Sequence, residues 1–95
     1  MILHTVNKSA YSTSILTDLE KFLAKPDMIL FIEDGVLGLS HSDLISLNEA
    51  CSGIYALSPD INARGIDAHV PAFVTRVDYQ GFVELAFRCR SVRNG

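Results

Sequence analysis

Apolar residues along this chain alternate between two arrangements, short continuous runs and stripes at helical spacing. The runs are typical of strands, and they cover residues 2–6, 28–32, 54–57 and 72–77. Residues 28–32 are apolar at every position, as expected of a parallel strand that is covered on both faces. The runs therefore predict at least four strands.

Between these runs the apolar positions repeat at helical spacing. The clearest stripe is Ile15, Leu16, Leu19, Phe22 and Leu23, which predicts an amphipathic helix over residues 15–25 that Pro26 ends. Ser12, Thr13 and Ser14 all precede this stripe, and any one of them is a candidate cap for the helix.

Three further helices are predicted from their end signals. One begins at Ser40, with Asp43 as a capping-box partner, and ends near residues 51–53. A short helix begins at 58–60, Ser-Pro-Asp, and Gly65 closes it. Asp78 caps the last helix, whose apolar face holds Tyr79, Phe82, Val83, Ala86 and Phe87.

The order of elements, strand and helix in strict alternation, predicts an α/β fold. Right-handed crossovers give a mainly parallel sheet of four to five strands between two helical layers. Residues 91–95 are expected to form a tail. A chain of 95 residues with no internal linker or repeat predicts a single domain over 1–95.

Composition narrows the function. The longest apolar run is too short to span a membrane, and no signal peptide is visible, so we expect a soluble cytoplasmic protein. A net charge of −3 argues against a freestanding DNA-binding protein. The mean hydropathy of +0.25 is high for so small a domain, and it predicts apolar surface that another subunit covers.

Parallel sheets place their sites at the carboxyl ends of strands, which directs attention to four loops: residues 7–14, 33–39 and 58–60, and the loop at Asp78. Loop 7–14 carries Lys8, Ser9 and further hydroxyl groups that could hold an anion, but it lacks glycine. The second loop holds Asp34 and Gly35. It is either a turn in which Gly35 supplies positive φ or part of a site. A phospho-receiver site is excluded, because no acceptor Asp follows the third strand directly.

The remaining candidate residues do not combine into a recognisable catalytic or metal-binding motif. His4, placed near the carboxyl end of the first strand, is either a hydrogen-bonded structural residue or an acid–base group. Asp60 and Arg64 are spaced for a helical ion pair. Cys51 and Cys89 lie too far apart for a metal or redox motif, and no metal or other cofactor is expected. Cys89 lies between Arg88 and Arg90, which makes it a weak candidate for a reactive thiol.

Several short motifs together resemble the DsrH/TusB family. They are Leu3-His4-Thr5-Val6-Asn7-Lys8-Ser9, Glu33-Asp34-Gly35-Val36, Tyr55-Ala56-Leu57 with Asp60, Ala63-Arg64-Gly65, and Val77-Asp78-Tyr79 with Phe82-Val83. The resemblance implies that His4, Ser9, Asp34, Gly35, Asp60, Arg64 and Gly65 belong to the family's pattern.

The resemblance also implies a DsrE/F/H-like fold and a subunit of a cytoplasmic sulfur-relay complex. Such a complex is a heterohexamer with DsrE-like and DsrF-like (TusD- and TusC-type) siblings, and in one branch it supports 2-thiolation of the tRNA wobble uridine. The sulfur-carrying cysteine there belongs to a sibling. DsrH-type relatives in sulfur oxidation carry a cysteine in the first helix, where this chain has none.

We therefore expect a non-catalytic, interface-forming subunit. The alternatives are a DsrH-type subunit in intracellular sulfur oxidation, a persulfide carrier that uses Cys89, and a small-molecule-binding module that uses loop 7–14. Self-association of the isolated chain and a contact between its arginine-rich end and tRNA both stay open.

Overall fold

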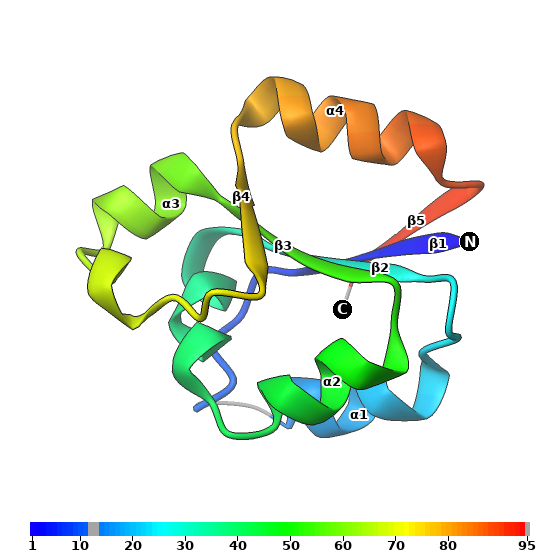
Figure 1. Ribbon diagram of the computed structural model, residues 1–95, viewed down its shortest axis with the longest axis horizontal. Coiled ribbons are helices and arrows are strands. Elements are labelled where there is room, and N and C mark those ends of the chain that lie inside the picture. Colours follow the sequence, from blue (N-terminus) through cyan, green and yellow to red (C-terminus); the bar gives the residue numbers. More distant parts are fainter. Residues whose placement is uncertain (12–13, 95) are drawn as a thin grey trace.

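The computed structural model describes residues 1–11 and 14–94, which form a parallel β-sheet between helical layers (Figure 1). Its described strands run in the order β4-β3-β2-β1-β5, and every neighbouring pair is parallel. They are β1 (Ile2–Val6), β2 (Met28–Phe31), β3 (Gly53–Leu57), β4 (Val74–Val77) and β5 (Ser91–Asn94). The predicted α/β fold class is confirmed.

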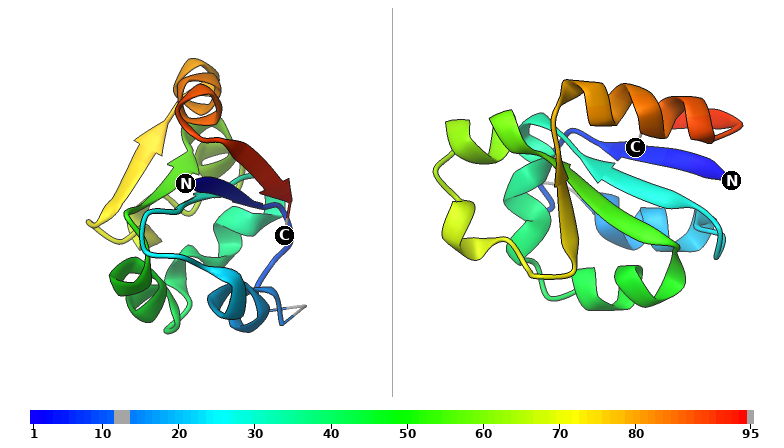
Figure 2. Two further views of the ribbon diagram at one scale, coloured as in Figure 1. Left: turned by 90° about the vertical axis from the view of Figure 1, so that its right-hand side faces the viewer. Right: turned by 45° about the horizontal axis from the view of Figure 1, so that its top comes forward.

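Helices cover both faces of this sheet. The helical elements are α1 (Ile15–Phe22), the 3₁₀ helix η1 (Glu33–Ser40), α2 (Leu44–Ala50), α3 (Ser58–Ala63), the 3₁₀ helix η2 (Asp67–His69) and α4 (Tyr79–Arg88). The helices α1 and α2 lie on one face and α4 on the other (Figures 1 and 2). Right-handed crossovers explain this, because β1 to β4 progress in one direction and the return from β4 to β5 runs the opposite way.

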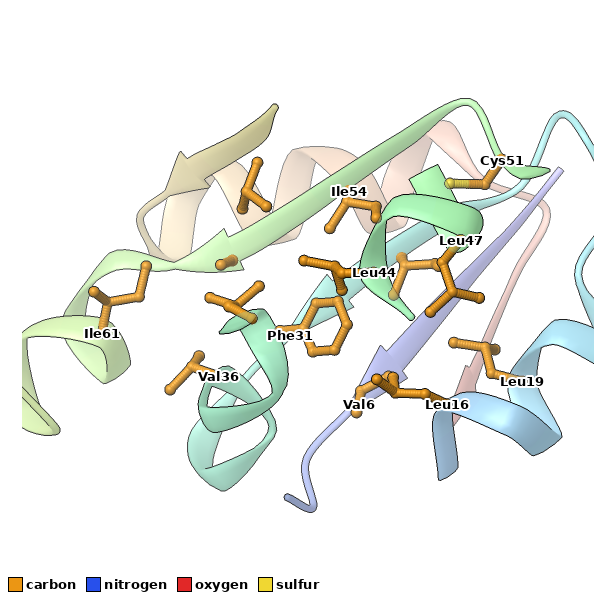
Figure 3. Packing of buried hydrophobic residues seen from close by; sticks show 14 residues of the cluster. Val6, Leu16, Leu19, Phe31, Val36, Leu44, Leu47, Cys51, Ile54 and Ile61 are labelled. Atoms are coloured by element: carbon orange, nitrogen blue, oxygen red, sulfur yellow. The ribbon is translucent and has the colours of Figure 1, made fainter. Parts of the chain in front are cut away.

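The strand β2 shows why its sequence is apolar throughout. Its alternate side chains point to opposite faces, so Ile29 and Phe31 join the cluster under α1, α2 and η1 (Figure 3). Met28 and Leu30 instead join a smaller cluster against α4. The face toward α1 and α2 carries the larger of the two clusters.

The C-terminal segment corrects the sequence prediction. Residues 91–94 form the edge strand β5, paired with β1, instead of a tail. All four of its residues are exposed, so no apolar pattern marked them as a strand. Backbone pairing holds the strand in place, together with the hydrogen bond that Thr5 Oγ1 donates to Asn94 Oδ1 at 2.6 Å.

Two helix boundaries also differ from prediction. The helix predicted from Ser40 is two elements, because η1 extends to that residue and α2 begins only at Leu44. The backbone N–H of Asp43 donates to His41 Nδ1 at 3.1 Å, so the predicted capping box is absent from this described segment. The first helix ends at Phe22, before residue 25.

Other predicted end signals hold. Asp78 caps α4 by accepting a hydrogen bond from the Gly81 backbone N–H at 2.7 Å. Gly65 has φ of 64° just after α3, as a helix-ending glycine should. Within the described part of the chain, no helix is long and apolar enough to cross a membrane.

Candidate functional site

Three of the predicted site residues, Asp34, Asp60 and Arg64, meet at the carboxyl ends of β2 and β3. Arg64 donates from Nε and Nη2 to Asp34 Oδ1, at 3.1 and 2.9 Å. It also lies 3.6 Å from Asp60 Oδ1, which confirms the predicted helical pair. Gly65 follows directly and ends α3. The ion pairs thus tie α3 to η1.

Glu33 stands at the centre of this cluster, and the sequence analysis did not identify its role. Its φ of 51° lies in the left-handed region, which is costly for a residue with a side chain. Asp60 Oδ2 accepts a hydrogen bond from the Glu33 backbone N–H at 2.7 Å, which holds this turn. No sequence signal marks the position, because glycine or asparagine is the usual residue there.

Gly35 is required for a different reason from the predicted one. The left-handed residue of this turn is Glu33, and Gly35 is a glycine because of close packing. A Cβ at Gly35 would lie 1.9 Å from the carbonyl oxygen of Val6, at the end of β1. The glycine therefore lets the turn after β2 lie directly against the turn after β1.

The cluster holds α3 and η1 in fixed positions relative to each other. Arg64 neutralises two carboxylates, and both are already engaged in hydrogen bonds. Both cysteines lie at the opposite, amino edge of the parallel sheet, since Cys51 precedes β3 and Cys89 precedes β5. The cluster therefore has the features of a structural clamp between loops and lacks a thiol nucleophile.

His4 lies elsewhere, in a buried hydrogen-bonded pair with Asp27. Its ring points toward the amino edge of the sheet, where Nε2 donates to Asp27 Oδ2 at 2.9 Å, so its predicted place near the carboxyl end is wrong. Asp27 also accepts from the backbone N–H groups of Ile2, at 2.9 Å, and Ala24, at 3.1 Å. Burial opposes the charged form of Asp27, but these hydrogen bonds outweigh it and lower its pKa. His4 is a hydrogen-bonded structural residue here.

The two thiols are poorly suited to nucleophilic chemistry. Burial raises the pKa of Cys51, which lies at the edge of the larger core cluster (Figure 3). Burial also raises the pKa of Cys89, and the nearby amino terminus and Arg88 only partly oppose it. A raised pKa leaves less thiolate at neutral pH, and the thiolate is the nucleophile.

Loop 7–14 is described only in part. Ser9 Oγ accepts a hydrogen bond from the Tyr11 backbone N–H at 3.2 Å. Ser14 does not cap α1 with its side chain and donates to Asp18 Oδ2 at 3.1 Å. Ser12 and Thr13 lie outside the described residues. Among the residues described, no group of three His, Cys, Asp or Glu side chains could hold a metal ion.

The outer face of α4 exposes several large apolar side chains. Tyr79, Val83 and Phe87 are 61%, 51% and 85% exposed, while Phe82 and Ala86 are half-buried beside them. The apolar face predicted for this helix thus points mostly outward, and Leu85 is the residue that it buries against the sheet. The helices α1 and α2 lie on the other side of the sheet from α4 (Figures 1 and 2).

Sequence comparisons with known proteins agree on one family. Residues 8–92 match the family model described as "DsrH like protein". Protein TusB of Photorhabdus laumondii is 40% identical over 89 residues, which cover 92% of this chain and 93% of that protein. Protein TusB of Salmonella dublin is 36% identical over the same shares.

A solved structure has the same fold. The solution NMR structure of protein Tm0979 from Thermotoga maritima superposes with a TM-score of 0.71 and covers 93% of both chains, at 21% sequence identity. The matched length and the identity to the TusB proteins carry the assignment further than the fold alone. This chain belongs to the DsrH/TusB family.

Proposed function

We propose that this protein is a non-catalytic, interface-forming subunit of a cytoplasmic sulfur-relay complex that supports 2-thiolation of the tRNA wobble uridine. Its partners in this proposal are DsrE-like and DsrF-like siblings in a heterohexamer. Membership of the DsrH/TusB family supports the relay role. We further propose that residues 1–95 fold as one domain.

The outward apolar face of α4 carries the proposal. We define this α4 face as Tyr79, Phe82, Val83, Ala86 and Phe87. Fully burying a single aromatic or aliphatic side chain stabilises a complex by about 1.5–3 kcal/mol. Exposed aromatic residues that cluster on one helix are typical of protein–protein interfaces, where aromatic anchors contribute most of the affinity.

The state of the thiols favours a supporting role. Both cysteines are buried, and burial raises the pKa of each thiol. A persulfide carrier needs a thiolate that its donor can reach. The sulfur-carrying thiol is therefore assigned to a sibling, and Cys89 is not expected to receive sulfur.

The test is co-expression with DsrE-like and DsrF-like siblings from the same organism, followed by mass and stoichiometry in solution. We expect one hexameric species that contains this chain. The Cys51→Ser and Cys89→Ser variants should assemble and keep the 2-thiouridine content of tRNA in a complemented deletion strain. A well-folded chain that associates with neither sibling would contradict the subunit role, and lost thiolation in Cys89→Ser alone would contradict the non-catalytic one.

A further inference from the structure

A cavity lies between α1 and the β1–β5 edge of the sheet, away from both the Asp34–Asp60–Arg64 cluster and the α4 face. Its volume is about 250 Å³. Val6 of β1 and Ile15, Leu19 and Phe22 of α1 form its apolar walls. The strand β5 lies beside β1, and its Arg93 and Asn94 complete the lining. This volume suits a small molecule of about one ring.

The topology places this cavity beside an edge strand of the sheet. Starting from β1, the sheet grows in one direction through β2, β3 and β4 and in the other direction through β5 alone. The connection from β1 to β2 contains α1 and crosses one face of the sheet. The connection from β4 to β5 contains α4 and crosses the other face (Figure 2). The cavity lies under α1, on the face of the sheet opposite α4 and beside the edge strand β5.

The charged groups of the lining indicate the kind of ligand. Lys8 follows β1 and Arg93 lies in β5, and neither forms an ion pair with any residue that the structure describes. The Arg93 guanidinium lies over the Phe22 ring, 4.4 Å from its centroid, which positions this charge beside the apolar wall.

The other ionisable groups of the lining are already engaged. Asp18 accepts a hydrogen bond from the Ser14 hydroxyl, and the His4 ring donates to Asp27. Lys8 and Arg93 together outnumber Asp18, so the cavity has a net positive lining. An incoming anion would meet two cations without having to displace an internal carboxylate from either.

We propose that this cavity, between α1 and the β1–β5 edge, binds a small amphipathic anion. The apolar body of the ligand lies against Leu19 and Phe22, and its phosphate, sulfonate or carboxylate group contacts Lys8 and Arg93. The inference does not depend on the subunit role, because the cavity and the α4 face lie on opposite faces of the sheet.

Titration of the ¹⁵N-labelled chain with phenyl phosphate, followed by amide chemical shifts, tests the site. We expect saturable shifts at Val6, Lys8, Leu19 and Asn94, and at least tenfold weaker binding of inorganic phosphate and of benzylamine. Inorganic phosphate lacks the ring, and benzylamine carries the opposite charge, so the two controls separate the apolar and ionic contributions.

Variants assign the binding to the proposed residues. Lys8→Gln and Arg93→Gln should each raise the Kd for phenyl phosphate threefold or more, whereas Lys21→Gln, which removes an exposed charge of α1, should not. Ile15→Phe should fill the cavity and abolish binding. If that variant does not fold, the charge variants decide alone. No saturable shift up to about 10 mM, shifts confined to α4, or equal binding by Lys8→Gln and Lys21→Gln would overturn the proposal.

Discussion

The Asp27 carboxylate fixes the start of β1 against the start of β2, and its removal should cost a large part of the protein's stability. Oδ1 accepts from the Ile2 backbone N–H, while Oδ2 accepts from His4 Nε2 and the Ala24 backbone N–H. Both Asp27 and His4 are almost fully buried. The Asp27→Asn substitution preserves shape and removes one acceptor atom together with the charge.

The expected cost follows from the hydrogen bonds. The asparagine keeps most bonds if its oxygen takes the Oδ2 position, but its NH₂ group then faces the Ile2 N–H. A buried donor without an acceptor costs about 1–3 kcal/mol, and the two remaining bonds lose their charge assistance. We expect Asp27→Asn to lower the free energy of unfolding by about 2–4 kcal/mol. Small domains have only about 5–15 kcal/mol in total.

Urea denaturation at several pH values measures this effect and its origin. The pKa of Asp27 in the folded chain lies below its ordinary value of 3.8, so the folded state favours the charged form. The stabilisation is complete above the unfolded pKa and is lost as pH falls through the folded one. The difference between wild type and Asp27→Asn should therefore be constant from about pH 6 to 8 and shrink below about pH 4.

A matched control comes from an exposed carboxylate. Asp67→Asn removes a surface ion pair with Arg76, and it should cost less than about 1 kcal/mol. The reasoning is refuted if Asp27→Asn costs no more than this control. It is also refuted if its cost is the same at pH 3 and pH 7.

Three further predictions concern the loops and the thiols. Gly35→Ala should destabilise the chain by about 1–3 kcal/mol in urea denaturation, because its Cβ would overlap the Val6 carbonyl oxygen; a neutral result would contradict this close packing. Glu33→Gly should be tolerated and Glu33→Val should cost about 1 kcal/mol more, since a β-branched residue is strained at positive φ; equal thermal stability of the two would argue against the left-handed turn. Iodoacetamide should modify Cys51 and Cys89 more slowly than it modifies the unfolded chain, with rates that rise toward high pH; mass spectrometry that finds either thiol fast at pH 7 would contradict the raised pKa values.

Much of the fold follows from apolar spacing alone. The continuous apolar run at 28–32 predicted a sheet covered on both faces, and its alternate side chains do enter two separate clusters. End signals that act through local geometry were also reliable, as Asp78 and Gly65 show. Such signals depend on residues near in sequence, so the sequence alone contains them.

Features that depend on distant backbone were not visible in the sequence. The strand β5 is exposed at every residue, and only its pairing with β1 makes it a strand. The need for a glycine at Gly35 comes from Val6, which precedes it by 29 positions. Glu33 adopts positive φ because Asp60, brought near by α3, accepts its N–H.

The candidate site residues also differ in how much of their role can be predicted from the sequence. The resemblance selected Asp34, Asp60 and Arg64 as candidates, and the structure brings these three together in one ion-pair cluster. The resemblance also selected His4, which lies in a separate buried pair with Asp27, a residue that sequence reasoning did not select. In the sequence, Asp27 is marked only by its place directly before the most apolar strand. Its role can be recognised only once β1 is known to lie beside β2.

The role of the α4 face in binding the siblings is tested by comparing two exposed apolar residues on opposite faces of the sheet. Phe87 of the α4 face is 85% exposed and Ile45 of α2 is 62% exposed, so serine at either position should leave the fold intact. With tagged DsrE-like and DsrF-like siblings as bait, we expect Phe87→Ser to weaken capture of this chain at least tenfold, as loss of an interface anchor does, and Ile45→Ser to leave it unchanged. Undiminished capture of Phe87→Ser would contradict the claim that the α4 face is the subunit interface.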